Sequence, residues 1–188
     1  EQGYKSGLWR RSNLVGIKAP VFSMSKLIGV DNYLGPEMKS TGEVMGLDFD
    51  FAGALTKALI ASGLMLPSKG SMLLSVADRD KTEFVALVKM LHELGYGMYA
   101  TEGTAAMIAA LGMPVKMVTK KLSEGHPNVI DVIRDHSVQG VVNTITGGRL
   151  ALKDGFAIRR AAVERRIPCY TSLDTVRVAL EAVANAGH

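Results

Sequence analysis

The sequence has a single cysteine, Cys169, so the chain can form neither an internal disulfide nor a cysteine-based metal cluster. Cys169 stands in an apolar run, where a buried, inert thiol is a better interpretation than a nucleophile. Lys/Arg-rich runs of the kind that mark nucleic-acid or membrane surfaces are missing. No signal peptide opens the sequence, and no apolar run of about 18 residues could span a bilayer. We therefore expect a cytoplasmic protein that binds neither membrane nor nucleic acid.

The sequence also lacks the usual groupings of catalytic residues. No His, Asp and Glu residues follow the spacing of metal ligands, and no Ser-His-Asp order is evident. The four histidines are scattered, which is typical of surface or helix-end positions. We expect no catalytic site and no metal site.

What the sequence has, from Ser71 onward, is a regular alternation of short apolar runs and amphipathic stretches with helical spacing. The runs predict strands at Met72–Val76, Gly97–Ala100, Val115–Val118, Gly140–Asn143 and Pro168–Tyr170. The stretches predict helices at Thr82–Leu94, Thr104–Leu111, Asn128–Asp135, Phe156–Arg166 and Leu173–Ala186. Strands that alternate with helices indicate an α/β fold, a doubly wound five-stranded parallel sheet with helices on both faces.

The first 62 residues or so do not share this rhythm. Leu14–Val21 is apolar and extended, Gly35–Gly46 is rich in turn residues, and Phe51–Ser62 has the pattern of an amphipathic helix. This is too little material for an independent core. The segment predicts the end of a larger upstream domain, joined to the α/β domain near Gly63–Gly70.

In sheets of this kind ligands bind at the carboxyl ends of the strands, so the loops that follow the strands are where a site is expected. After the second strand of the α/β domain come Thr101, Gly103 and Thr104. Thr101 could act as a helix cap, its hydroxyl accepting an amide of the first turn. The same helix start, with Gly103 allowing close approach, could instead seat a phosphate. Spacing alone leaves both interpretations open.

The neighbouring loops favour the second interpretation. Lys81 follows the first strand, the lysine pair Lys120-Lys121 follows the third, and Asn143 and Thr144 follow the fourth. A helix cap needs none of these groups. Their convergence on one sheet edge predicts a site for a small anion, most simply a phosphate, and the net charge of +4 is compatible with it.

Four stretches, ATEGT, KKLSEGHPNVID, NTITGGR and AIRRAAVERRIP, resemble the methylglyoxal-synthase-like regulatory domain at the C-terminus of carbamoyl-phosphate synthase large subunits. The upstream stretch GPEMKSTGEVMG resembles the end of the second ATP-grasp synthetic unit of the same family. The resemblance implies a three-layer methylglyoxal-synthase-like domain at residues 64–188. Residues 1–63 would then be the end of the ATP-grasp carbamoyl-phosphate synthetic domain.

The family makes carbamoyl phosphate, for pyrimidine and arginine biosynthesis, from bicarbonate and glutamine-derived ammonia. Its large subunit uses ATP with Mg or Mn and works with a glutaminase small subunit. The resemblance implies that this chain binds an effector, UMP or IMP, and has neither a cofactor nor catalytic activity of its own. It also implies that the protein forms homo-oligomers. The implied effector-phosphate residues are Lys81, Thr101, Gly103, Thr104, Lys121, Asn143 and Thr144.

Other aspects of the resemblance leave alternatives open. Thr171 matches the junction position of a second effector, ornithine, and Ile145 replaces a hydroxyl residue of some relatives. Methylglyoxal synthase, a lyase that acts on dihydroxyacetone phosphate, shares the fold, but this chain has Arg149 after its glycine pair where we expect that enzyme's catalytic aspartate. An oligomerisation module is a further alternative.

Overall fold

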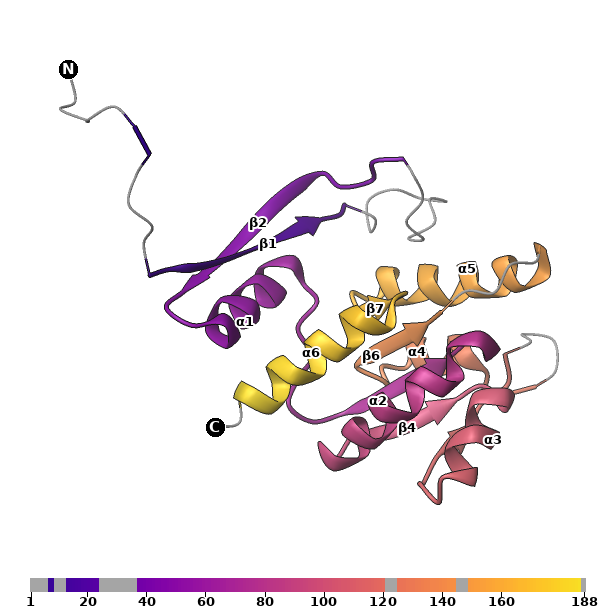
Figure 1. The fold of residues 1–188 in the computed structure, drawn as a ribbon. Coiled ribbons are helices and arrows are strands. Elements are labelled where there is room, and N and C mark those ends of the chain that lie inside the picture. Colours follow the sequence, from indigo (N-terminus) through magenta and orange to yellow (C-terminus); the bar gives the residue numbers. More distant parts are fainter. Residues whose placement is uncertain (1–6, 9–12, 24–36, 121–124, 145–148, 187–188) are drawn as a thin grey trace.

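The computed structural model describes residues 7–8, 13–23, 37–120, 125–144 and 149–186, with no side-chain description for residues 149–153. The predicted site residue Lys121 and the position Ile145 lie outside these ranges. The elements follow one another along the chain as shown in Figure 1. They are β1 (Val15–Val21), β2 (Gly42–Asp48), α1 (Phe51–Ser62), β3 (Ser71–Ser75), the short 3-10 helix η2 (Asp78–Asp80), α2 (Lys81–Glu93), β4 (Gly97–Ala100), α3 (Glu102–Ala110), β5 (Lys116–Met117), α4 (Val129–Arg134), β6 (Gly140–Asn143), α5 (Arg149–Glu164), β7 (Cys169–Tyr170) and α6 (Leu173–Ala186).

The main sheet has five strands in the order β5-β4-β3-β6-β7, and all its pairs are parallel. The predicted doubly wound α/β fold is confirmed. β3 stands at the centre, the chain adds β4 and β5 on one side of it, and it then returns to add β6 and β7 on the other. The point where the order reverses lies between β3 and its neighbours β4 and β6. Ligands of such sheets bind at this point.

Two apolar clusters cover the two faces of the sheet. One face, with Leu74 and Val142, packs against buried residues of α1, α2, α3 and α6. The other face, with Leu73 and Val141, packs against α4 and α5. Alternate residues of a strand point to opposite faces, which is why neighbouring residues of β3 and β6 divide between the two clusters.

The predicted bounds of several elements agree with the structure, and those of α5 do not. β4, β6, α1 and α6 begin and end where the sequence placed them. α5 begins at Arg149 rather than Phe156, because Gly155 lies inside the helix instead of breaking it. A Cβ on Gly155 would lie 2.6 Å from Nη1 of Arg159. Glycine has a low helix propensity, but at this position the absence of a Cβ leaves space for the buried Arg159 side chain.

The N-terminal part forms a two-stranded antiparallel ribbon, β1 with β2, packed on α1. Figure 1 shows the ribbon above α1, and α1 beside α6. The sequence predicted turns through Gly46, whereas Gly42 and Gly46 both lie in β2. A Cβ on Gly46 would approach the Ala54 carbonyl oxygen to 2.0 Å. Gly46 therefore serves close packing of β2 on α1 and not a turn.

Two tyrosines of the main domain hold the segment that connects α1 to β3. Tyr170 Oη donates to the Leu64 carbonyl oxygen at 2.5 Å, and Tyr96 Oη donates to the carbonyl oxygen of Pro67. Burial raises the pKa of both hydroxyls above the ordinary tyrosine value, so each remains protonated and able to donate.

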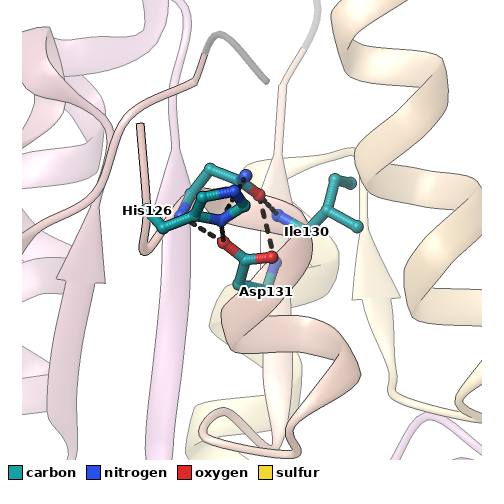
Figure 2. A network of polar contacts seen from close by, with 4 residues as sticks. His126, Ile130 and Asp131 are labelled. Carbon is teal, nitrogen blue, oxygen red and sulfur yellow. Dashed lines mark hydrogen bonds and ion pairs between the residues drawn. The ribbon is translucent and has the colours of Figure 1, made fainter. Parts of the chain in front are cut away.

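Short helix α4 begins at a capping box. Asn128 Oδ1 accepts from the amides of Ile130 and Asp131 at 2.9 and 3.1 Å, and Asp131 Oδ2 accepts from the Asn128 amide at 2.9 Å. Figure 2 shows His126 turned toward the same carboxylate, with Nδ1 2.5 Å from Asp131 Oδ2. The Asn128 amide first, and His126 second, hold the pKa of Asp131 below its ordinary value.

Candidate anion-binding site

A pocket opens at the carboxyl ends of β3, β4 and β6, where the strand order reverses. Its volume is about 200 Å³. The lining residues come from the last residue of β3, from the loops and helix starts after β3, β4 and β6, and from the loop after β5. They are Ser75, Val76, Ala77, Asp78, Lys81, Thr101, Glu102, Gly103, Thr104, Lys120 and Thr144. Of the predicted phosphate residues, the structure therefore brings together Lys81, Thr101, Gly103, Thr104 and Thr144.

Thr101 occupies the N-cap position of α3, but its hydroxyl does not cap the helix. That part of the prediction is wrong. The Thr101 carbonyl oxygen instead accepts from the amides of Thr104 and Ala105, at 2.9 and 2.7 Å. The side chain is only 6% exposed and lines the pocket, and its hydroxyl forms no hydrogen bond with any described residue. A buried hydroxyl of this kind is available to a ligand.

The first turn of α3 contributes two further donors. No described group accepts a hydrogen bond from the amides of Glu102 and Gly103, as expected for the first residues of a helix. Together with the helix dipole, such amides favour a bound anion. Gly103 presents its amide without a Cβ that would crowd the approach.

Thr104 and Thr144 join the loop after β3 to its neighbours. Thr104 Oγ1 accepts from the Val76 amide at 3.1 Å, and Thr144 Oγ1 accepts from the Ala77 amide at 2.8 Å. A hydroxyl can accept and donate at once, so each keeps its single hydrogen for another acceptor. Thr104 Oγ1 also lies 3.5 Å from the Val76 carbonyl oxygen, at the long limit of a hydrogen bond. Both threonines thus fix the pocket wall and still offer a donor.

The cations of the pocket are Lys81 and Lys120. Lys81 is the first residue of α2, one residue before the predicted start of this helix, and its Nζ lies 2.7 Å from Asp78 Oδ1. The same Nζ lies 3.0 Å from the position that a Cβ on Gly103 would take. Lys120 lines the pocket and its amide donates to Glu102 Oε1 at 3.3 Å.

Asn143 lies at the end of β6 but is not among the pocket-lining residues. Its Oδ1 accepts from Nη1 of Arg159 at 2.8 Å, and both side chains are buried. A guanidinium only donates, so it fixes which end of the amide faces α5 and turns the NH₂ group of Asn143 away from it. Direct contact of Asn143 with a phosphate remains a prediction, whereas its partner Arg159 was missed.

Thr171 follows β7, at the far side of β6 from the pocket, and does not line it. A second effector site there stays a prediction. Sequence reasoning also missed Ser75 and Asp78, which line the pocket. Ser75 comes directly after the apolar run Met72–Leu74. A polar residue at the end of a predicted strand could have indicated a site residue.

Comparison with known proteins identifies a domain within the chain. Residues 83–171 match the family model described as the MGS-like domain. The chain contains an MGS-like domain. The matched residues include α3 and β6, whereas β3 and Lys81 precede them.

The chain, MGS-like domain included, is 52% identical over 187 residues to the carbamoyl phosphate synthase large chain of Thermomicrobium roseum. The alignment covers 100% of this chain and 17% of that protein, so the chain spans about a sixth of its relative. Among solved structures, methylglyoxal synthase from Elizabethkingia anophelis NUHP1 is similar, with a TM-score of 0.47 and 20% sequence identity. That match covers 61% of this chain and 79% of the other.

The described residues contain neither a candidate metal site nor a helix that could span a membrane. Among them, no three His, Cys, Asp or Glu residues are grouped so that they could bind a metal ion. In the same ranges, every helix is too short or too polar to cross a bilayer. Cys169 is half-buried in β7 rather than fully buried.

Proposed function

We propose that this chain is the effector-binding part of a carbamoyl phosphate synthase large chain, and that its pocket binds the phosphate group of a nucleoside monophosphate, UMP or IMP. The observation that carries the proposal is the set of unused donors at the start of α3. The buried Thr101 hydroxyl and the amides of Glu102 and Gly103 have no acceptor among the described residues, and Lys81 lies beside them. A phosphate has the charge and the acceptor oxygens to satisfy all of them.

The test is isothermal titration calorimetry of the chain with UMP and with IMP. Lys81→Ala and Thr101→Val should each weaken binding by about tenfold or more. This follows because a hydrogen bond to a charged group contributes about 1.5–3 kcal/mol, and about 1.4 kcal/mol corresponds to tenfold in affinity. Thr101→Val is suited to the purpose because the hydroxyl supports no other described group.

Lys89→Ala is the matched control. Lys89 lies on α2 like Lys81, but it is exposed and outside the pocket. Its removal should leave both affinities unchanged. Absence of binding by the wild-type chain, or equal affinities for the wild type and the two pocket variants, would overturn the proposal.

The similarity to a much longer relative supports a second part of the proposal. In the longer protein, an ATP-grasp part of the same large chain would make carbamoyl phosphate with ATP and Mg or Mn, fed with ammonia by a glutaminase small subunit. We expect that protein to act in pyrimidine and arginine biosynthesis in the cytoplasm and to form homo-oligomers. Effector binding would alter the ATP-dependent steps by favouring one of two arrangements of the chain.

Exposed apolar side chains of β2, of the turn after it and of the start of α1 support contact with such an ATP-grasp part. Met45, Phe49 and Phe51 are 61%, 79% and 60% exposed. In a full-length large chain that carries this segment, Phe49→Asp should lower the midpoint of thermal unfolding, because it would place a charge in a buried contact. In the 188-residue chain the same change should leave the midpoint almost unchanged. Equal shifts in the two proteins would contradict the contact.

A further inference from the structure

The anion pocket is lined by two carboxylates as well as by cations. Glu102 Oε1 accepts from the amide of Lys120, and Asp78 Oδ1 lies 2.7 Å from Nζ of Lys81. A carboxylate beside an anion pocket lowers the affinity for the anion, because like charges repel. The place of Asp78 therefore calls for a reason of its own.

The Lys81 ammonium has two neighbours with opposite effects on it, the start of α3 and the Asp78 carboxylate. Its ammonium lies against Gly103, at the start of α3, where the helix dipole and the unused amides are positive. A cation there is favourable only with a negative group beside it, and in the structure that group is Asp78. The pairing with Lys81 lowers the pKa of Asp78, so the carboxylate is ionised at neutral pH.

The two partners differ in exposure. The Lys81 side chain is 24% exposed, whereas that of Asp78 is 90% exposed. Lys81 is thus inside the pocket and Asp78 is at its rim. A phosphate at the start of α3 would reach the same ammonium from within, and Asp78 would stay at the rim beside whatever the phosphate is attached to.

We propose that Asp78 is a specificity-determining residue of this pocket, which competes with the ligand for Lys81 and selects phosphate monoesters over diphosphates. The inference rests on the proposed function. A second phosphate group at the rim adds negative charge next to a carboxylate and is repelled. A sugar hydroxyl at the same place donates a hydrogen bond to it.

The size of the effect follows from the exposure of Asp78. Exposed ion pairs are weak, and the interaction of such a carboxylate with one neighbouring charge changes an affinity by about two- to fivefold. Asp78→Asn should therefore raise the affinity for UMP by about this factor, because the nucleotide phosphate no longer competes with a carboxylate for Lys81. It should raise the affinity for UDP further, so that the preference for UMP over UDP falls by about two- to fivefold.

The experiment is titration calorimetry of the chain with UMP and with UDP, at neutral pH and constant ionic strength. Asp80→Asn is the matched control, because Asp80 precedes Lys81 directly, pairs with Arg79 at 3.4 Å and does not line the pocket. The control should keep the wild-type affinities and the wild-type ratio. Since Asn has the shape of Asp, thermal unfolding should verify that both variants fold like the wild type.

The outcomes separate the two proposals. An unchanged ratio of UMP to UDP affinity in Asp78→Asn, or a weaker affinity for UMP, would overturn the role of Asp78 while the effector site stands. A shift of the ratio by Asp80→Asn equal to that by Asp78→Asn would also overturn it, because the effect would then be one of general charge. If the wild-type chain binds neither nucleotide, the proposed function itself fails.

Discussion

Arg159 on α5 and Asn143 at the end of β6 are joined by a buried hydrogen bond of 2.8 Å, directly beside the strand end that carries Thr144. Arg159 is 0% exposed, and a guanidinium stays charged in proteins. The bond therefore places a permanent positive charge inside the domain, next to the anion pocket, and Gly155 makes room for it.

Replacing Arg159 by Met should destabilise the fold, because Asn143 Oδ1 then loses a charged donor in a buried place. We expect a loss of about 1.5–3 kcal/mol in the free energy of unfolding, measured with urea. Arg165→Met is the control, since Arg165 follows α5 and is exposed. Equal losses for the two variants would contradict the structural role of the pair.

The two threonines at the start of α3 should respond differently to the same change. Thr104→Val removes the acceptor of the buried Val76 amide and should cost about 1–3 kcal/mol of unfolding free energy. Thr101→Val removes a hydroxyl that bonds to no described group, so it should cost much less. Urea unfolding of both variants gives the comparison. A Thr101 variant as unstable as the Thr104 variant would show that the Thr101 hydroxyl supports the fold.

Gly46→Ala should loosen the packing of β2 on α1. The new Cβ would lie 2.0 Å from the Ala54 carbonyl oxygen and 2.6 Å from the Ala58 amide nitrogen, and backbone atoms cannot yield as side chains do. Overpacking of this kind costs about 1–3 kcal/mol or more. Gly42→Ala, in the same strand, meets nothing within 4 Å and should be close to neutral. Thermal unfolding distinguishes the two, and equal midpoints would refute the contact.

The capping box of α4 should make stability depend on acid pH. The pKa of Asp131 is lower in the folded chain than in the unfolded one, so its contribution is complete above the ordinary carboxyl pKa of about 4. The contribution is lost as the pH falls through the lower, folded value. Asp131→Ala should therefore be less stable than wild type at neutral pH, and the difference should shrink on acidification.

Urea unfolding at a series of pH values measures this difference. Glu93→Gln is the control, because the Glu93 side chain is exposed and forms no ion pair or hydrogen bond with the described residues. Its difference from wild type should stay small and nearly constant over the same range. A difference for Asp131→Ala that persists unchanged at acid pH would contradict a role of the ionised carboxylate.

The sequence was sufficient to predict the sheet and five of the eleven residues that line the pocket, for one physical reason. Carboxyl ends of parallel strands meet at one edge, so polar residues that follow the strands gather there whatever their distance in the chain. Lys81, Thr101, Gly103, Thr104 and Thr144 follow this rule. Asp78 also follows β3 and lines the pocket, but a carboxylate is not a group expected in a site for an anion, so it was not predicted.

The failures concern residues whose role is set by a distant partner. Gly46 looks like a turn residue, but α1 approaches it so closely that only glycine fits. Arg159 looks like a surface arginine beside Arg160, although Ile158 and Ala162 show that it lies on the buried side of α5. The helical spacing of the apolar residues in α5 therefore indicates that Arg159 is buried. The helical period does not show that Asn143, sixteen residues earlier, accepts a hydrogen bond from this arginine. That hydrogen bond makes the burial of Arg159 tolerable.

The tyrosine contacts of the connecting segment have a mechanical meaning. Composition alone suggests a loose tether between α1 and β3, because Gly63, Pro67 and Gly70 punctuate it. Instead, the hydroxyls of Tyr96 and Tyr170 donate hydrogen bonds to backbone carbonyl oxygens of this segment. Leu66, which lies between the two acceptor residues, is buried. The segment is therefore fixed to the main domain at two points, so we expect a displacement of β7 to move the chain that leads to α1 as well.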